Sequence, residues 1–296
     1  MTVMMLATQV FVFLDEMIDR YELPLGEWVN IAVRWANENI GWLFDAIAWP
    51  IAQLLDSTEW LLQSVPWYVV VLVVGVIAYL VQDWKTSLLF MGLLVFMGFL
   101  TDDLWRFAMT TIAMILTSVV ICVIIGIPVG IWAAKNDRVE ASVRPILDAM
   151  QTIHPFIYLL PVAFFFGIGK VPGTIATVIF ALPPMVRLTN LGIRQVPKET
   201  VEAANAFGST GRQTLLEVQL PLARPTIMAG LNQTLMLSLS MVVIAALIAG
   251  GGLGQLIFRA VSRVDIPAAT NSGLAVLIIA VILDRLSQTQ RKGAGE

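Results

Sequence analysis

The chain has 296 residues, of which 58% are apolar and 13% are charged, and its formal net charge at pH 7 is −3. Soluble proteins are roughly half apolar and a quarter charged, so this composition indicates a chain embedded in a membrane. The small net charge and the lack of a basic run argue against a nucleic-acid partner. The length accommodates several spans of about 20 residues, and we expect no second soluble domain of ordinary size.

Residues 1–65 are expected to form an extracytoplasmic tail that contains amphipathic helices. The opening stretch, "MLATQVFVFL", lacks the basic region and the small-residue cleavage site of a signal peptide, so we interpret it as retained. Downstream, apolar residues recur at helical spacing, at Trp28, Ile31, Ala32, Trp35 and Trp42. A tryptophan-rich amphipathic helix is typical of the membrane–water interface, and the alternative is a soluble helix packed on the outer loops of the same protein.

Seven apolar runs follow, and they predict an all-α integral membrane fold with about seven transmembrane helices. A lipid-exposed backbone must satisfy its own hydrogen bonds, so apolar runs of this length are expected to be helical. They make up a transmembrane domain over residues 66–285, and residues 286–296 form a cytoplasmic tail. The expected spans are Pro66–Val81, Thr86–Leu100, Phe107–Ala134, Ile146–Ile168, Pro172–Leu191, Thr226–Ala249 and Pro267–Leu283.

The distribution of basic residues predicts the orientation, because short cytoplasmic loops carry an excess of Lys and Arg. With the C-terminus in the cytoplasm, the loops on that side hold twelve of the 18 basic residues. The N-terminus is then outside the cell. The basic residues that remain on the outer side are Arg20, Arg34, Arg106, Lys170, Arg259 and Arg263.

The sequence contains no catalytic constellation and no metal-binding pattern. His154 is the only histidine, and Ser238 and Ser240 have no base at a motif spacing. The single cysteine, Cys122, lies in an apolar run and is interpreted as a packing residue. The phosphate-binding pattern G-x-x-x-x-G-K-[ST] is also missing. We therefore expect that the chain itself is not an enzyme and binds neither a cofactor nor a metal.

Two glycine-containing stretches are poor matches to nucleotide-binding loops. In "GIGKVPGT", Gly167–Thr174, Lys170 is followed by Val171 and both flanks are apolar, so a turn between two spans is predicted. The stretch "AGGGLGQL", Ala249–Leu256, lacks the third glycine of a dinucleotide fingerprint and a preceding strand. We interpret it as an outer loop or a re-entrant bend.

Residues 196–221 form a polar loop between apolar runs. Each of its charges would cost about 2.5–3.5 kcal/mol at the bilayer centre, so the loop must lie outside the membrane. Pro197 suits the first position of a helix, and Gly208 supplies the left-handed residue that ends it. Thr210 opens a capping box, and Pro221 is expected to stop the second helix. Two short helices with a tight bend would form a compact cytoplasmic knob suited to docking.

A spaced motif runs through this loop. Glu202-Ala203-Ala204 is followed by Gly208, by Val218 and by Leu220-Pro221. This pattern resembles the EAA loop of bacterial ABC importer permeases, with Val where that family usually has Ile. The flanking stretches "FALPPMVRLTNLGIRQVP" and "LPLARPTIMAGLNQTLMLSLSMVVIAALIAGGGLGQLI" are similar to the permease subunit of glycine betaine/proline betaine importers. The resemblance covers most of residues 24–286.

The resemblance implies the membrane-spanning subunit of an ATP-driven importer in the bacterial cytoplasmic (inner) membrane. The EAA loop would be a coupling helix seated on a separate cytoplasmic ABC ATPase, which uses ATP and Mg. The other implied partners are an extracytoplasmic substrate-binding protein, a second copy of the permease in a homodimer, and membrane lipid. The residues of the ATPase-coupling interface would be Glu202, Ala203, Ala204, Gly208, Arg212, Leu220 and Pro221.

The same resemblance implies that the substrate is a quaternary ammonium or related methylated amine osmolyte: glycine betaine, proline betaine, choline, carnitine or trimethylamine N-oxide. Such a cation carries its charge behind methyl groups and is bound by aromatic faces, and no acidic residue lies at the centre of an expected span. An ABC importer for another solute, such as an amino acid, is one alternative. A secondary transporter or channel without an ATPase is another, but it predicts an inverted repeat and a buried ion-coupling acid that we do not find.

Polar residues inside the expected spans are candidates for the translocation pathway, although intramembrane amides and hydroxyls also join helices by hydrogen bonds. His154 either lines the pathway or caps a helix break before Pro155. Asp148 is expected to pair with Arg144 or with the neighbouring subunit. The pathway candidates are Gln151, Thr152, His154, Asn190, Asn232, Gln233, Ser238 and Ser240.

Overall fold

The computed structural model describes residues 24–101, 103–249 and 251–287. Within these ranges the regular structure is helical and contains no strand, which confirms the all-α class. The signal-like opening stretch and most of the tail 286–296 lie outside the described residues. The chain divides into two compact units, with the boundary between Phe44 and Asp45.

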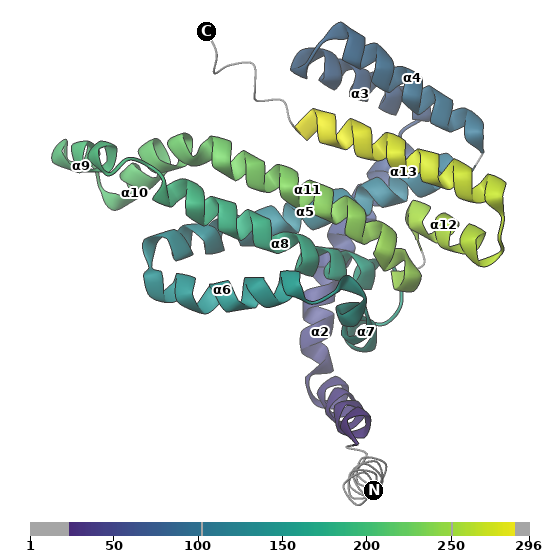
Figure 1. Ribbon diagram of the computed structural model, residues 1–296, viewed down its shortest axis with the longest axis horizontal. Helices are drawn as coiled ribbons and strands as arrows, with labels where there is room; N and C mark the ends of the chain where they lie inside the picture. The colour runs from purple at the N-terminus through teal and green to yellow at the C-terminus, as the bar shows by residue number, and fades with distance from the viewer. Residues whose placement is uncertain (1–23, 102, 250, 288–296) are drawn as a thin grey trace, which may run out of the picture. The chain divides into compact units, whose positions relative to one another are not determined.

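The helices are labelled in Figure 1 in the order in which they follow along the chain. Short turns connect most of them, as expected for antiparallel neighbours in a helical membrane protein. They are α2 (Leu25–Ser64), α3 (Trp67–Val81), α4 (Trp84–Leu100), α5 (Leu104–Lys135), α6 (Asp137–Thr152), α7 (Pro155–Phe166), α8 (Lys170–Arg194), α9 (Lys198–Ala206), α10 (Gly211–Gln213), the π-helix η1 (Thr214–Gln219), α11 (Leu220–Ala249), α12 (Gly252–Ser262) and α13 (Ile266–Ser287).

The first unit contains the N-terminal half of α2. Ile40 has φ −124° and ψ 15°, values that interrupt the helix with a kink. Trp28, Ile31 and Trp35 lie before the kink and Trp42 lies after it, so the apolar stripe is helical but not straight. The interfacial position of this helix stays a prediction.

Within the described ranges, four helices are long and apolar enough to cross a membrane: α5, α8, α13 and the continuous helix Gly211–Ile248. The number rises to six if the bent pairs of α2 with α3 and of α6 with α7 each count as one span. The expected count of seven is therefore not confirmed. One reason is length, because α3 has 15 residues and α4 has 17, which correspond to about 22 Å and 25 Å against a hydrocarbon core of about 30 Å.

The expected span Ile146–Ile168 is wrong as a single helix. The structure divides it between α6 and α7, which are bent by 103° relative to each other. Pro155 is the cause, because it disfavours the α-helical conformation for the residue before it, and His154 adopts φ −60° and ψ 136°. The chain turns sharply where the sequence pattern predicted an uninterrupted helix.

The helix α8 packs against α5 along a seam of small residues. A Cβ atom on Gly126 would lie 2.7 Å from Cγ of Met185, and one on Gly130 would lie 2.5 Å from Cβ of Thr189. Glycines four residues apart let two helix backbones approach closely inside a membrane. The matching order of the two pairs shows that α5 and α8 run parallel.

On its other side α8 packs against α11. Gly192 lies close to Thr226, and Gly230 lies close to Leu188, so these two helices run antiparallel. Figure 1 shows α5, α8 and α11 running side by side, with α9 at one end of the group. The polar loop is therefore mounted on the adjoining ends of α8 and α11.

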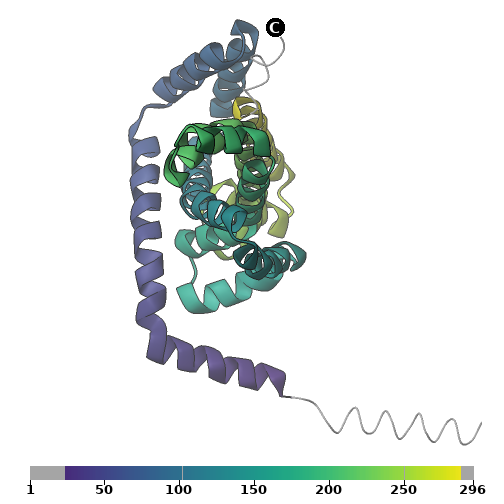
Figure 2. The ribbon, with the colours of Figure 1, turned by 90° about the vertical axis from the view of Figure 1, so that its left-hand side faces the viewer.

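The remaining part of α2, Asp45–Ser64, belongs to the second unit and runs across the direction of α8 and α11 (Figure 1 and Figure 2). Leu55 is fully buried there, and Ile51 and Leu62 are half-buried against the apolar core of the unit. The hairpin of α3 and α4 packs on α13. The expected N-terminal tail included Asp45–Ser64, with packing on the rest of the protein as an alternative, and in the structure this stretch belongs to the second unit.

Candidate functional site

The polar loop between α8 and α11 begins with the short helix α9. Pro197 occupies the N-cap of this helix, one residue earlier than the first helical position that the sequence suggested. Its fixed φ angle, here −55°, is suited to starting a helix. The helix carries Glu202 and Ala203 on its exposed surface, while Ala204 is half-buried.

A left-handed glycine ends α9, as the sequence predicted. Gly208 has φ +85°, its N–H donates to the carbonyl of Asn205 at 3.0 Å, and the N–H of Ser209 donates to the carbonyl of Ala204 at 3.1 Å. This pair of bonds is the Schellman motif, which satisfies carbonyls that a helix end leaves free. Since Gly208 has open space around it, the constraint on this residue is its backbone conformation and not its packing.

The next helical turn starts with the predicted capping box. The N–H of Thr210 donates to Oε1 of Gln213 at 2.9 Å, and the N–H of Gln213 donates back to Oγ1 of Thr210 at 3.4 Å. Oγ1 of Thr214, a buried residue, donates to Oδ1 of Asn205 at 3.2 Å and ties this turn to α9. The bend between the two helices is therefore held by local hydrogen bonds.

The prediction that Pro221 stops the second helix is wrong. The helix continues from Gly211 to Ile248 and becomes the membrane span α11. A π-helical stretch makes this possible, because the N–H of Leu220 donates to the carbonyl of Leu215, five residues earlier. The wider turn relieves the clash that a proline ring makes with the carbonyl four residues before it. The loop thus consists of one short helix, α9, and the first turns of the long helix that becomes the span, and it is not a knob of two short helices.

The loop exposes an apolar side chain that the sequence reading missed. Phe207, at the C-cap of α9, has 92% of its surface exposed, and Arg212 and Pro221 are exposed nearby in the chain, while Leu220 is half-buried. An aromatic side chain that projects freely from a rigid turn is suited to filling a pocket on a partner. The available signal was an apolar residue inside an otherwise polar, capped segment.

The candidate pathway residues do not form one cluster. Gln151 and Thr152 are exposed at the end of α6, and Oγ1 of Thr152 donates to the carbonyl of Asp148 at 2.7 Å. Nδ1 of His154 accepts the N–H of Phe156 at 3.4 Å, and the two rings stack with centroids 5.3 Å apart. His154 therefore has the geometry of the helix-capping alternative, and its role in a pathway stays a prediction.

On α11, the four remaining hydroxyl and amide candidates have different surroundings. Oδ1 of Asn232 accepts from Oγ of Ser287 on α13 at 2.5 Å, which is a helix-joining contact. Ser240 donates to the carbonyl of its own helix at Met236, and Gln233 is exposed. Ser238 is fully buried, and its hydroxyl has no partner within the described residues.

The end of α8 nearest the loop carries a network of charges. Arg194 pairs with Asp137 at 2.7 Å and with Glu140 at 2.9 Å. Asn190 joins it, since its Oδ1 accepts from Nε of Arg194 at 2.9 Å and its Nδ2 donates to Oε1 of Glu140 at 3.3 Å. The network borders a cavity of about 350 Å³ between α6 and α8.

A second ion pair on the same cavity corrects a sequence prediction. Asp148 pairs with Arg187 of α8, Nη2 to Oδ1, at 2.5 Å, and not with Arg144 of its own helix. The packing of α6 along α8 brings Arg187 within reach, and a pattern confined to one helix cannot report this contact. Both partners are largely exposed, so the pair contributes little to stability.

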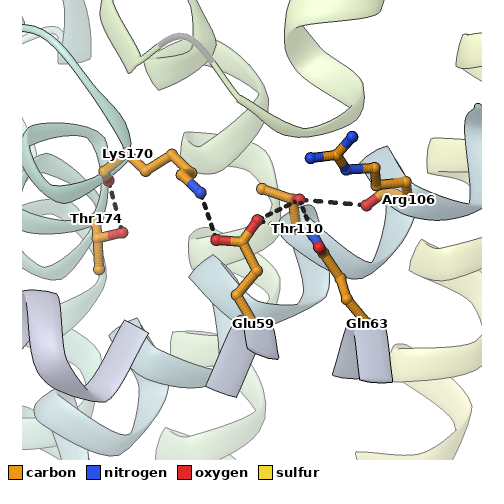
Figure 3. A network of polar contacts seen from close by, with 6 residues as sticks. All are labelled: Glu59, Gln63, Arg106, Thr110, Lys170 and Thr174. Atoms are coloured by element: carbon orange, nitrogen blue, oxygen red, sulfur yellow. Dashed lines mark hydrogen bonds and ion pairs between the residues drawn. The ribbon is translucent and has the colours of Figure 1, made fainter. Parts of the chain in front are cut away.

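The opposite end of α8 carries a more enclosed network (Figure 3). Nζ of Lys170 lies 2.5 Å from Oε2 of Glu59. The other carboxylate oxygen, Oε1, accepts from Oγ1 of Thr110 at 2.8 Å and from Nε2 of Gln63 at 2.9 Å. Glu59 is therefore held by partners from α2, α5 and α8, and its side chain is only 12% exposed.

Sequence reasoning missed Glu59 and recognised Lys170 only as part of a turn. The two residues are 111 positions apart, and no periodicity links them. The available signal for Glu59 was a carboxylate in a stretch with many apolar residues. A buried carboxylate requires a partner, but the sequence cannot say which cation supplies it.

Comparisons with known proteins agree with this architecture. The family model described as "Binding-protein-dependent transport system inner membrane component" matches residues 126–288. The glycine betaine/proline betaine transport system permease protein ProW of Escherichia coli is 46% identical over 269 residues, which cover 90% of this chain and 75% of that protein. The glycine betaine/carnitine transport permease protein GbuB of Listeria monocytogenes is 54% identical over 192 residues, 65% of this chain and 68% of that protein.

A solved structure shares the fold. A chain of the MetNI methionine ABC transporter in an inward-facing conformation is similar with a TM-score of 0.57 and 21% identity, covering 62% of this chain and 93% of that one. This likeness confirms a fold of the ABC importer permease type. Taken with the family match and the curated relatives, it shows that the chain belongs to the family of binding-protein-dependent transport system inner membrane components.

Proposed function

We propose that the chain is the translocating subunit of an ATP-driven importer for a quaternary ammonium or related methylated amine osmolyte. The observation that carries the proposal is the capped loop Pro197–Gln213, which projects Phe207 and Glu202 from the joined ends of α8 and α11. A secondary transporter without an ATPase has no need of such a loop. The relatives named above, whose names refer to glycine betaine, proline betaine and carnitine, support the choice of substrate class.

The loop is proposed to seat in a groove of a cytoplasmic ABC ATPase, which binds ATP and Mg. Glu202, Ala203, Gly208 and Arg212 are exposed there, and the small residues permit close approach by another surface. Charged residues at such a contact determine how the two proteins align and how fast they associate more than they determine the affinity. Because the second helix of the loop continues into α11, a displacement of the loop is transmitted directly to a membrane span.

The remaining partners and the orientation are also part of the proposal. The resemblance to importer permeases supports a homodimer in the lipid bilayer, with an extracytoplasmic binding protein that delivers the substrate. The positive-inside distribution supports a cytoplasmic C-terminus and an outer N-terminus. In this orientation Lys170 and Glu59 lie near the outer face, and Arg187 and Arg194 lie near the inner face.

The pathway is proposed to form between two copies of the chain. The eight candidate residues, Gln151 to Ser240, are not connected to one another by a hydrogen bond within the described part of the chain. If both copies line the pathway, the candidate residues do not need to contact one another within a single copy of the chain. Of the eight, Ser238 is the residue whose buried hydroxyl has no partner among the described residues, which makes it the first candidate to replace.

The test uses proteoliposomes that contain the chain with the ATPase and binding-protein subunits of its own transport system. We expect uptake of labelled glycine betaine that requires ATP, and stimulation of ATP hydrolysis by the loaded binding protein. Reversing the charge at Glu202 with Glu202→Lys should lower both activities by roughly threefold or more, since it disturbs the alignment of the loop on the ATPase. The matched control is Glu38→Lys, which reverses an exposed charge in the first compact unit, outside the loop.

Three outcomes would contradict the proposal in different ways. Uptake by the lone chain under an ion gradient would support a secondary transporter. ATP-dependent uptake of an amino acid such as methionine, without uptake of glycine betaine, would support an importer for another solute. Unchanged activity in Glu202→Lys would remove this residue from the coupling interface.

A further inference from the structure

The contact between Lys170 and Glu59 lies at the start of α8. The other end of this helix leads into the polar loop, residues 196–221, which is called the coupling loop from here on. Lys170 and Arg194 are the two ends of one helix of 25 residues, about 37 Å long. Any displacement of α9 is therefore applied to one continuous helix, interrupted by no break although it contains Pro183 and Pro184, whose far end is bonded to Glu59.

The packing around Lys170 fixes its position on two sides. Its aliphatic stem crosses Gly251, where a Cβ atom would lie 2.9 Å from Cγ of Lys170. Its ammonium group reaches the carboxylate of Glu59, which also accepts from Thr110 of α5 (Figure 3). One side chain of α8 thus touches α2, and also the turn that follows α11.

Within its residues Asp45–Ser64, the helix α2 has few other described polar contacts with the rest of the second unit. Its residues Asp45–Ser64 contribute Leu55 to the apolar core, and Glu59 and Gln63 make the described hydrogen bonds to other elements. Apolar contacts between α2 and its neighbours lack direction, whereas an ion pair with both carboxylate oxygens satisfied favours one position. The charge pair is therefore the feature that sets where α8 begins relative to α2.

We propose that Glu59 is a positioning residue for transport: through Lys170 it holds the start of α8 as a fixed point, so that motion imposed at the coupling loop tilts the helix instead of translating it. This inference rests on the proposed function, because it assigns a role within ATP-coupled transport. A helix that is displaced at one end tilts in a defined direction only when its other end is held in place. Without Glu59 the same push is partly lost as sliding of α8.

The experiment measures the number of substrate molecules taken up per ATP hydrolysed, in proteoliposomes of the complete complex. Glu59→Gln keeps the size of the side chain and its capacity to accept from Thr110 and Gln63, but it removes the charge. We expect the ratio to fall about threefold to tenfold while the amount of assembled complex stays unchanged. The matched control is Asp56→Asn, which removes an exposed charge from the same helix and should leave the ratio unchanged.

The exchange variant Glu59→Lys with Lys170→Glu separates positioning from general stability. It restores an attractive pair in the opposite sense, so we expect the ratio to recover at least in part relative to Glu59→Gln. A wild-type ratio in Glu59→Gln overturns the proposal. A ratio that stays low in an exchange variant that assembles normally also overturns it, since the charge pair would then not be the cause.

A cross-link tests the fixed point without depending on the stability of the single variants. Glu59→Cys with Lys170→Cys, joined by a short thiol-reactive linker, locks α2 to α8, and the native Cys122 is fully buried. Because a fixed point does not open, we expect the linked complex to keep most of its uptake. Loss of uptake on linking, with recovery when a cleavable linker is cut, overturns the proposal in favour of a contact that must open. Failure of the wild-type complex to transport contradicts the proposed function instead.

Discussion

The two ends of α8 are stabilised in different ways. At the coupling end, the Schellman motif at Gly208 and the capping box at Thr210 join residues that are at most five positions apart. At the other end, Lys170 meets Glu59, 111 positions away, and lies against Gly251 of the turn after α11. The loop is specified by local sequence, although the last turn of α8 is also joined to α6 through Arg194, whereas the contact at Lys170 exists only when several helices have packed.

This difference matches what each end is proposed to do. A surface that docks on a partner must keep its shape while it projects from the bundle, and local capping bonds provide this without help from other elements. A point that resists movement has to be connected to the rest of the molecule. Substitutions that perturb one end at a time can therefore separate the two roles.

The largest effect is expected at the assembled end, from Gly252→Ala. Gly252 has φ +67°, and a Cβ atom there would lie 2.5 Å from Oγ1 of Thr111, which accepts the N–H of Leu253 at 2.8 Å. Strain and overpacking together should lower the free energy of unfolding by about 3 kcal/mol. Thermal unfolding of the purified chain in detergent measures this. Gly273→Ala, where a Cβ atom meets open space, is the control, and equal midpoints for the two variants would contradict the prediction.

The next effect concerns the coupling end, where Gly208→Val should reduce ATP-driven uptake about tenfold without lowering the thermal midpoint of the bundle. A β-branched residue at φ +85° costs roughly 1–2 kcal/mol or more, and the strain is confined to the loop because no other group lies within 4 Å. Gly211→Val is the control, since Gly211 is helical and also faces open space. Wild-type uptake in Gly208→Val would show that the shape of the turn is not required.

A smaller effect is expected from Phe207→Ala. Removal of an exposed aromatic anchor should raise the Kd for the ATPase subunit about tenfold, equivalent to about 1.4 kcal/mol, and leave the stability of the isolated chain unchanged. Binding to the purified ATPase measures it. Ile168→Ala truncates a side chain that is similarly exposed, 83% against 92%, at the opposite end of α8. If both variants bind alike, Phe207 is not an anchor.

The smallest effect is expected from Thr210→Ala, which deletes one half of the capping box. The loss of an N-cap costs about 1 kcal/mol and should increase hydrogen exchange at the amide of Gln213 about fivefold, with only a modest decrease in uptake. Thr210→Ser retains the hydroxyl and should preserve protection. Unchanged exchange in the alanine variant would mean that the π-helical continuation, and not the cap, holds this turn.

Much of the coupling end could be predicted from the sequence. Gly208, Thr210 and Gln213 are recognisable because capping chemistry depends on residue type at fixed short spacing. The same reasoning failed at Pro221, where proline normally ends a helix. The hydrogen bond from the N–H of Leu220 to the carbonyl of Leu215 lets the helix continue. Whether a helix ends at a proline or continues through a wider π-helical turn depends on whether the residues that follow are stabilised by packing as a membrane span.

The all-α membrane class, the polar loop and the family resemblance could be predicted before the structure was known, because each follows from composition, from hydrophobic run length or from short-range spacing. The pairing of Asp148 with Arg187 and the contact of Glu59 with Lys170 became visible only in the packed structure, whereas the bend between α6 and α7 at His154 follows locally from Pro155. These contacts depend on which faces of α2, α6 and α8 lie together in the packed bundle. Such information is distributed over the whole chain, and no local pattern contains it.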